Sequence, residues 1–205
     1  MIIDKSKLDT FDKRYRAALI NSIHGFKPIN LIGSIDSEGL SNLAIFSSVT
    51  HFGADPALFG LISRPDSVNR HTLENIRQTN FFTVNHVNAD ILEQAHQTSA
   101  RYPREVSEFD AVGLQSEYVD NFPAPFVQES HIKFGCKLVR EIPIQENGTI
   151  LVLAQIETII LPEEIIEDDG HINIEKADTI TGSGLSRYHE TKLIKRLAYA
   201  KPQQK

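Results

Sequence analysis

Side chains that could bind a phosphate follow the apolar segment Leu43–Phe46. The first group is the run of hydroxyls at Ser47, Ser48 and Thr50. Hydroxyls and freed backbone N–H groups at the end of a strand can together surround a phosphate. Such a short motif is weak, and taken alone it fits a solvated strand end better than a binding site.

A second anion-binding feature closes the next apolar segment, Ala57–Ser63, where Ser63 is followed by Arg64. Neighbouring strands of a sheet lie about 5 Å apart, so the two strand ends can meet at one anion. The forked guanidinium of Arg64 suits a phosphate. The alternative is a surface arginine that pairs with Asp66.

The third feature is the start of a helix predicted over His71–Thr79, where Arg70, His71 and Thr72 gather. The N-terminus of a helix presents unpaired N–H groups and favours negative charge. Three anion-binding features within one short window indicate a phosphate site more strongly than any one of them. The small and apolar residues Leu43–Phe46 would let a planar ring approach the backbone beside it, and they also suit a core strand.

Composition excludes several classes of protein. The chain has 205 residues, a net charge of −6 and 40% hydrophobic residues, which is typical of a soluble globular protein. A negative chain is a poor binder of nucleic acid, and no apolar run approaches the roughly 20 residues that cross a bilayer. The single cysteine and the charged N-terminus predict a cytoplasmic protein without an intramolecular disulfide.

The predicted elements are mostly strands, with short helices between some of them. Asn147-Gly148 predicts a tight turn between the two longest strands. Because strands and helices do not alternate regularly, an antiparallel barrel of about six strands fits better than a doubly wound sheet. We expect one domain over residues 1–205, with a helical extension at 1–25, a tail at 190–205 and a surface excursion at 101–111. The predicted strands are Lys27–Ile35, Ser41–Val49, Ala57–Ser63, Asn80–Asn85, Ile132–Ile142 and Thr149–Leu161, and the predicted helices are Thr10–Ser22, His71–Thr79 and Asp90–Ala100.

An ordered set of segments resembles the flavin reductase-like family of FMN-binding split barrels. The segments are SNLAIFSSVTHFGADPALFGLISR, HTLENIRQTNFFTVN, YPREVSEF, FVQESHIKFGCKLV and SGLSRYH, and they match in order from about Lys27 to His189. The resemblance implies a mainly β fold, a six-stranded antiparallel Greek-key split barrel with a few short helices. It also implies a homodimer that holds FMN at its interface.

The resemblance also implies which residues contact the cofactor. The strand after residue 41 would face the flavin ring and ribityl chain, and the later groups would hold the phosphate. His71 departs from the pattern, since an aspartate is usual there. The implied cofactor-binding residues are Asn42, Ala44, Ile45, Phe46, Ser47, Ser48, Ser63, Arg64, Arg70, His71, Thr72 and Asn75, together with Glu129, Arg187 and Tyr188.

The functional hypothesis is an FMN-dependent oxidoreductase that passes electrons from NAD(P)H through FMN to an acceptor, because a flavin itself supplies the redox chemistry. No catalytic residue is assigned, and no HExxH motif or Cys/His cluster predicts a metal site. Three alternatives stay open: an FMN-binding electron carrier, a non-enzymatic flavin-binding protein, and a split barrel that binds another phosphate. The sequence does not identify the electron acceptor.

Overall fold

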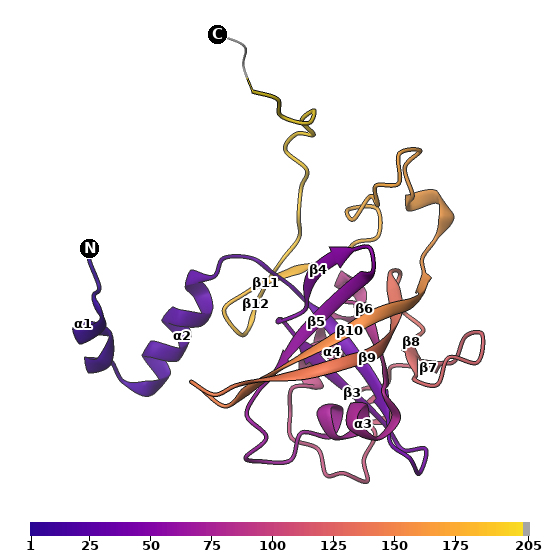
Figure 1. The fold of residues 1–205 in the computed structure, drawn as a ribbon, viewed down its shortest axis with the longest axis horizontal. Helices are drawn as coiled ribbons and strands as arrows, with labels where there is room; N and C mark the ends of the chain where they lie inside the picture. The colour runs from indigo at the N-terminus through magenta and orange to yellow at the C-terminus, as the bar shows by residue number, and fades with distance from the viewer. Residues whose placement is uncertain (203–205) are drawn as a thin grey trace.

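A curled antiparallel sheet of seven strands forms the body of the protein (Figure 1). The computed structural model describes residues 1–202. The strand order is β3-β2-β6-β9-β10-β5-β4, and every neighbouring pair is antiparallel. The strands are β2 (Asn30–Ile35), β3 (Ser41–Phe46), β4 (Thr50–Ala54), β5 (Ala57–Ser63), β6 (Phe81–His86), β9 (Lys133–Ile144) and β10 (Thr149–Ile160).

The predicted number of six strands is wrong, because β4 is a strand in its own right. Its residues pair with β5 from Thr50 opposite Gly60 to Ala54 opposite Ala57. Four of its five residues are exposed, so β4 has no apolar face and shows no alternating pattern in the sequence. Sequence patterns detect buried strands better than exposed edge strands such as this one.

The predicted hairpin is confirmed as β9 and β10, the two longest strands. Gly148 has a φ of 72°, and the Asn147 side chain accepts a hydrogen bond from the Thr149 N–H at 3.0 Å. Positive φ favours glycine at this position. The turn therefore sets the register that runs from Thr149 opposite Ile144 to Ile160 opposite Lys133.

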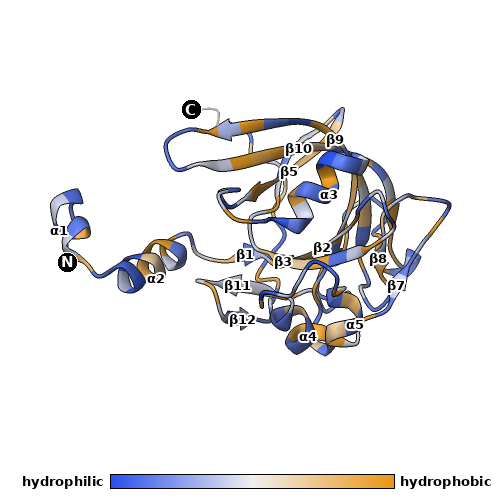
Figure 2. Ribbon diagram, turned by 90° about the horizontal axis from the view of Figure 1, so that it is seen from below, coloured by the Kyte–Doolittle hydropathy of each residue, from blue (hydrophilic) through white to orange (hydrophobic). Residues whose placement is uncertain are grey.

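Two apolar clusters occupy the two sides of the sheet. The first lies within the curl and includes Ile32, Val84 and Phe134, with Leu73 and Ile76 of helix α3 (His71–Thr79). The second lies under the short helices α4 (Leu92–Gln97) and α5 (Glu108–Val112), which Figure 2 shows on the same side of the body. Its members include Leu31, Leu43, Val87, Phe109 and Ile180. Burying apolar side chains on both sides stabilises the curled sheet.

The predicted surface excursion at 101–111 is partly wrong. Its last residues form α5, in which Glu108 and Phe109 are buried. Phe109 is 2% exposed and belongs to the second cluster. One apolar residue among charged neighbours carries too little periodicity to predict a buried helix.

The remaining elements are short. A three-stranded sheet joins β1 (Lys27–Pro28), β11 (Thr181–Ser183) and β12 (Arg187–His189). Helices α1 (Lys5–Thr10) and α2 (Lys13–Ile23) stand apart from the body in Figures 1 and 2, and neither contains a buried residue. The other short elements are η1 (Ala89–Ile91), η2 (Glu163–Ile165) and a pair formed by β7 (Ser116–Glu117) and β8 (Phe126–Val127).

Candidate functional site

The predicted ring-facing strand is β3, which lies at one edge of the sheet. Leu43 is fully buried in the second cluster, whereas Phe46 packs against the first. The two faces of the strand therefore contact the two apolar clusters, which fits the interpretation of Leu43–Phe46 as a core strand. The open part of β3 is its edge, because β2 is its only partner strand among the described residues.

Two backbone N–H groups on the free edge of β3, those of Leu43 and Ile45, differ in whether they have a hydrogen-bond partner. The N–H of Leu43 points away from β2 and donates to the carboxylate of Glu108 at 2.9 Å. Alternate N–H groups of a strand point the same way, so the N–H of Ile45 also points to the free edge. No carboxylate covers Ile45 in the described part of the chain, which leaves this N–H available to a planar ligand.

Ser48 joins the exit of β3 to the end of β5. Its hydroxyl donates to the Ile62 carbonyl at 3.0 Å and accepts from the Ile62 N–H at 3.3 Å. These are the backbone groups that a longer β4 would pair. Ser48 thus connects the residues after β3 to Ile62, which directly precedes Ser63 and Arg64, and its own hydroxyl already has two partners.

Arg64 is exposed, and its guanidinium has no hydrogen bond or ion pair within residues 1–202. The alternative pairing with Asp66 is not formed, because Asp66 instead pairs with Arg77 at 3.2 Å. Ser63 is buried and donates to the Arg64 carbonyl at 3.2 Å. Arg64 therefore ends β5 as a free positive charge.

The start of α3 contacts the beginning of β3, at the other end of the strand from Ser48. The Asn42 side chain of β3 donates to the Thr72 hydroxyl at 3.0 Å, which leaves the Thr72 O–H free to donate elsewhere. No side chain caps the first turn of α3, so its N–H groups lack a side-chain partner. Arg70 precedes the helix, and its Nε donates to the Pro65 carbonyl at 3.1 Å.

Asn75, one turn further along α3, has a different setting. It is 1% exposed, donates to the Ser34 hydroxyl at 3.2 Å and accepts from Arg104 at 2.8 Å. Arg104 also pairs with Glu74 at 2.7 Å and with Asp36 at 3.1 Å. These partners occupy Asn75 inside the protein, so it positions α3.

Glu108 is a residue of this region that sequence reasoning missed. It is 6% exposed, and burial raises the pKa of its carboxyl, while the Leu43 N–H and the nearby His71 lower it. Beside it, the Ser107 and Ser41 hydroxyls lie 2.8 Å apart. In the sequence, Glu108 lies in the segment YPREVSEF, which is part of the family resemblance but which predicts no role for any of its residues.

The last three predicted residues lie outside β3, β5 and α3. Glu129 accepts from the Gln115 N–H at 3.0 Å. Tyr188 of β12 contacts His96 of α4, with its hydroxyl 2.6 Å from Nδ1, and burial raises the pKa of the Tyr188 hydroxyl. Tyr188 packs against the same cluster as Ile45, whereas Arg187 is exposed. Tyr188 and Ile45 of β3 thus pack against one cluster. No hydrogen bond within the described residues joins Glu129, Arg187 or Tyr188 to Arg64.

Two further kinds of feature are absent from residues 1–202. No three His, Cys, Asp or Glu side chains come together there in an arrangement that could hold a metal ion. None of the helices in this range combines the length and the apolar character required to cross a membrane.

Residues 26–175 match the model of the family described as flavin reductase like domain. A crystal structure of a candidate flavin reductase with a split barrel domain from Shewanella frigidimarina is similar, with 46% identity and a TM-score of 0.94, covering 98% of this chain and 100% of that one. The 2-nitrobenzoate 2-nitroreductase NbaA of Pseudomonas fluorescens has 26% identity and a TM-score of 0.83, covering 98% and 96%. An uncharacterized protein of Aquifex aeolicus is 29% identical over 155 residues, covering 73% of this chain and 76% of that protein.

The fold and these matches define a split-barrel flavoprotein. The chain belongs to the flavin reductase like domain family, because the family model covers well over half of its residues. The described residues fit a flavin nucleotide. The guanidinium of Arg64, the first turn of α3 and the edge N–H of Ile45 are donors without a partner among the described residues, and they suit a phosphate and a flavin ring.

Proposed function

We propose that the protein is an FMN-binding oxidoreductase of the flavin reductase type, which passes electrons from NAD(P)H through FMN to an acceptor. What supports this proposal is that β3, the end of β5 and the start of α3 each hold donors without a partner among the described residues: the Ile45 N–H, the Arg64 guanidinium and the first N–H groups of α3. Bound FMN would supply the hydride and electron transfer, while the chain binds and orients it.

Each residue of the proposed site has a distinct task. Arg64, the hydroxyls of Ser47 and Thr72, and the first N–H groups of α3 hold the phosphate. Arg70 adds positive charge at the start of the helix, and His71 is its first residue. The edge N–H of Ile45 faces the ring, beside Ala44 and Phe46. Ser48, Ser63, Asn42 and Asn75 fix the strands and helix that carry these donors.

The proposed assembly is a cytoplasmic homodimer. A ring lying along the edge of β3 would leave one of its faces in water, and a second subunit is the natural cover. Glu129, Arg187 and Tyr188 would then contact the flavin or the electron donor at the interface. The packing of Tyr188 and Ile45 against one cluster supports this role for Tyr188.

A visible spectrum of the purified protein, with FMN added and excess removed, tests the proposal. We expect bound flavin absorbance that bleaches without oxygen when NADH or NADPH is added, and that returns when an acceptor is supplied. A colourless protein that ignores FMN would contradict flavin binding. Bound flavin that neither nicotinamide bleaches would instead indicate an electron carrier or a flavin-binding protein without this activity.

A further inference from the structure

Apolar side chains are exposed mainly at the two ends of the chain. We define the N-terminal arm as residues 1–25 and the C-terminal arm as residues 190–202. Ten of the twenty exposed large apolar residues lie in these arms, which are less than a fifth of the chain. These ten are Met1, Ile2, Ile3, Tyr15, Ile20, Ile23, Leu193, Ile194, Leu197 and Tyr199. Such a concentration indicates an interaction surface.

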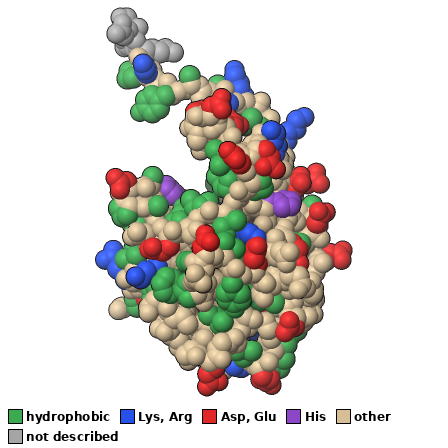
Figure 3. Space-filling model, turned by 90° about the vertical axis from the view of Figure 1, so that its right-hand side faces the viewer, with side chains coloured by type: hydrophobic (Ala, Val, Ile, Leu, Met, Phe, Trp, Pro, Cys, Tyr) green, Lys and Arg blue, Asp and Glu red, His purple; other side chains and the backbone are tan. Residues whose placement is uncertain are grey.

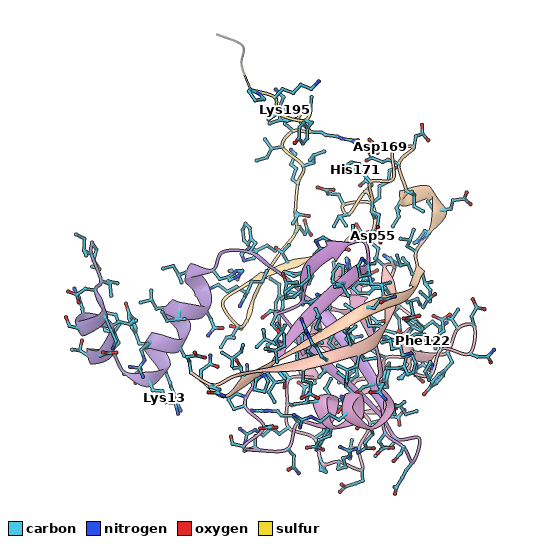
Figure 4. All side chains as sticks on the ribbon, in the orientation of Figure 1. Lys13, Asp55, Phe122, Asp169, His171 and Lys195 are labelled. Atoms are coloured by element: carbon cyan, nitrogen blue, oxygen red, sulfur yellow. The ribbon has the colours of Figure 1, made fainter. Side chains whose placement is uncertain are left out.

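Ion pairs connect the C-terminal arm to the body, although none of the residues of this arm is buried. In the C-terminal arm, Arg196 pairs with Glu167 at 2.9 Å and also with Asp169. Figure 4 shows Asp169 and His171 on the loop that faces this arm, with Lys195 beyond them. The contacts leave Ile194 98% exposed and Leu197 74% exposed. Figure 3 shows the arm rising from the body with apolar side chains along it.

The N-terminal arm has the same character. Tyr15, Leu19 and Ile23 are spaced four residues apart in α2, so they share one face of the helix. Tyr15 is 59% and Ile23 77% exposed, and no residue of α2 is buried. Just beyond the arm, the Phe26 ring packs against the His189 ring at a tilt of 58°, with centroids 4.8 Å apart, where the arm leaves the body.

Charge separates the arms from the rest of the chain. Residues 1–25 hold five Lys and Arg against three Asp and Glu, and residues 190–202 hold four against one. The remaining residues, 26–189, hold eleven basic against twenty-three acidic side chains. Basic arms with exposed apolar side chains therefore belong to a strongly acidic body, and opposite charges favour association.

We propose that both arms dock on the body of a second copy of this chain. Each copy offers the same arms and the same acidic body, so the contacts are reciprocal and close into a two-fold dimer. An anionic membrane would attract the arms as well, but it would repel the acidic body. The inference rests on the proposed homodimer and names the segments that build it.

The test measures the mass of the full-length protein in solution by light scattering across a dilution series. The arm variants are the double substitution Ile194→Glu with Leu197→Glu, and separately Ile20→Glu with Ile23→Glu. The matched control is Tyr118→Glu, since Tyr118 is 52% exposed and lies outside the arms. We expect a dimer whose dissociation constant rises at least about 30-fold in the arm variants, the scale of one lost interface hot spot, and hardly changes in the control.

The outcomes separate this inference from flavin binding, which is measured on the same samples by titration with FMN. A dimer that both arm variants leave intact would overturn the role of the arms. A wild-type monomer would overturn the dimer too, and if it still bound FMN the flavin site would stand. A monomer whose arms drive binding to vesicles of anionic phospholipid, lost in the arm variants, would overturn the inference in favour of a membrane surface. Circular dichroism checks that the variants fold.

Discussion

Two sets of polar groups in the same short helix, α3, differ in their hydrogen bonding. In its first turn, N–H groups have no side-chain cap, and the neighbouring Arg64 has no partner among the described residues. The side chains of Glu74 and Asn75, the fourth and fifth residues of the helix, are hydrogen-bonded to Arg104, which also contacts Asp36. We call the N–H groups of the first turn, together with Arg64, the unpaired end, because they have no side-chain partner. We call Glu74 and Asn75 with Arg104 the paired end, because their donors and acceptors are matched.

The difference indicates that the two sets of groups have separate roles, one in stability and one in ligand binding. A paired network fixes the position of α3 at no cost to its buried polar groups. An unpaired set of donors beside it stabilises nothing in the folded chain, so its natural use is to hold an anionic ligand. The paired end should therefore govern stability, and the unpaired end should govern binding.

The largest expected effect is at the paired end. Arg104→Ala removes the partner of Asp36, Glu74 and Asn75, and leaves their partly buried acceptors unmatched. We expect the free energy of unfolding to fall by about 2–3 kcal/mol, measured by urea denaturation.

Arg77→Ala is the matched control on the same helix. Arg77 pairs with Glu141 and Asp66, but its side chain is 41% exposed, so its loss should cost less than about 1 kcal/mol. Equal losses in the two variants would show that the Arg104 network is no more than another surface ion pair.

The next effect is at the unpaired end. Arg64→Ala should weaken the binding of FMN by about 1.5–3 kcal/mol, because a charged hydrogen bond to the phosphate is lost. The affinity for riboflavin, which lacks the phosphate, should barely change, and neither should the urea midpoint. Fluorescence titration with both ligands measures this, with the exposed Arg101 changed to Ala as the control. An equal loss for both ligands would assign Arg64 to the fold instead.

The smallest effect concerns Glu108, whose carboxyl belongs to the paired region through Leu43. Because burial raises its native pKa above 4.5, its contribution to stability is present below pH 4.5 and is lost as the pH rises through the native pKa. Glu108→Gln keeps an acceptor without the charge. We expect the free energy of unfolding of the variant to rise relative to that of the wild type as the pH increases, with a difference of about 1 kcal/mol at neutral pH.

The comparison that checks this uses urea denaturation at several pH values for both proteins. FMN affinity at neutral pH should be similar in the two. A stability difference that is flat with pH would contradict a raised pKa, and a large loss of FMN affinity would place Glu108 in the binding site.

The sequence predicted the central strands and α3 because their apolar residues repeat at the period of a buried strand or an amphipathic helix. It proposed one phosphate site for Ser47, Arg64 and Thr72, because the ends of neighbouring strands lie close together and the helix start follows them, and this stays a prediction. It missed β4, whose exposed residues carry no pattern, and it missed Glu108 and Arg104. Their partners lie between 29 and 68 residues away along the chain, and no local pattern encodes such pairings.

The most direct measurement of the central claim is a calorimetric titration of the wild-type protein with FMN and with riboflavin at the same ionic strength. If the ends of β3 and β5 and the start of α3 form a phosphate site, FMN binds at least about tenfold more tightly, because its phosphate meets the unpaired donors. Equal affinity for the two ligands, or no binding of either, would contradict the account.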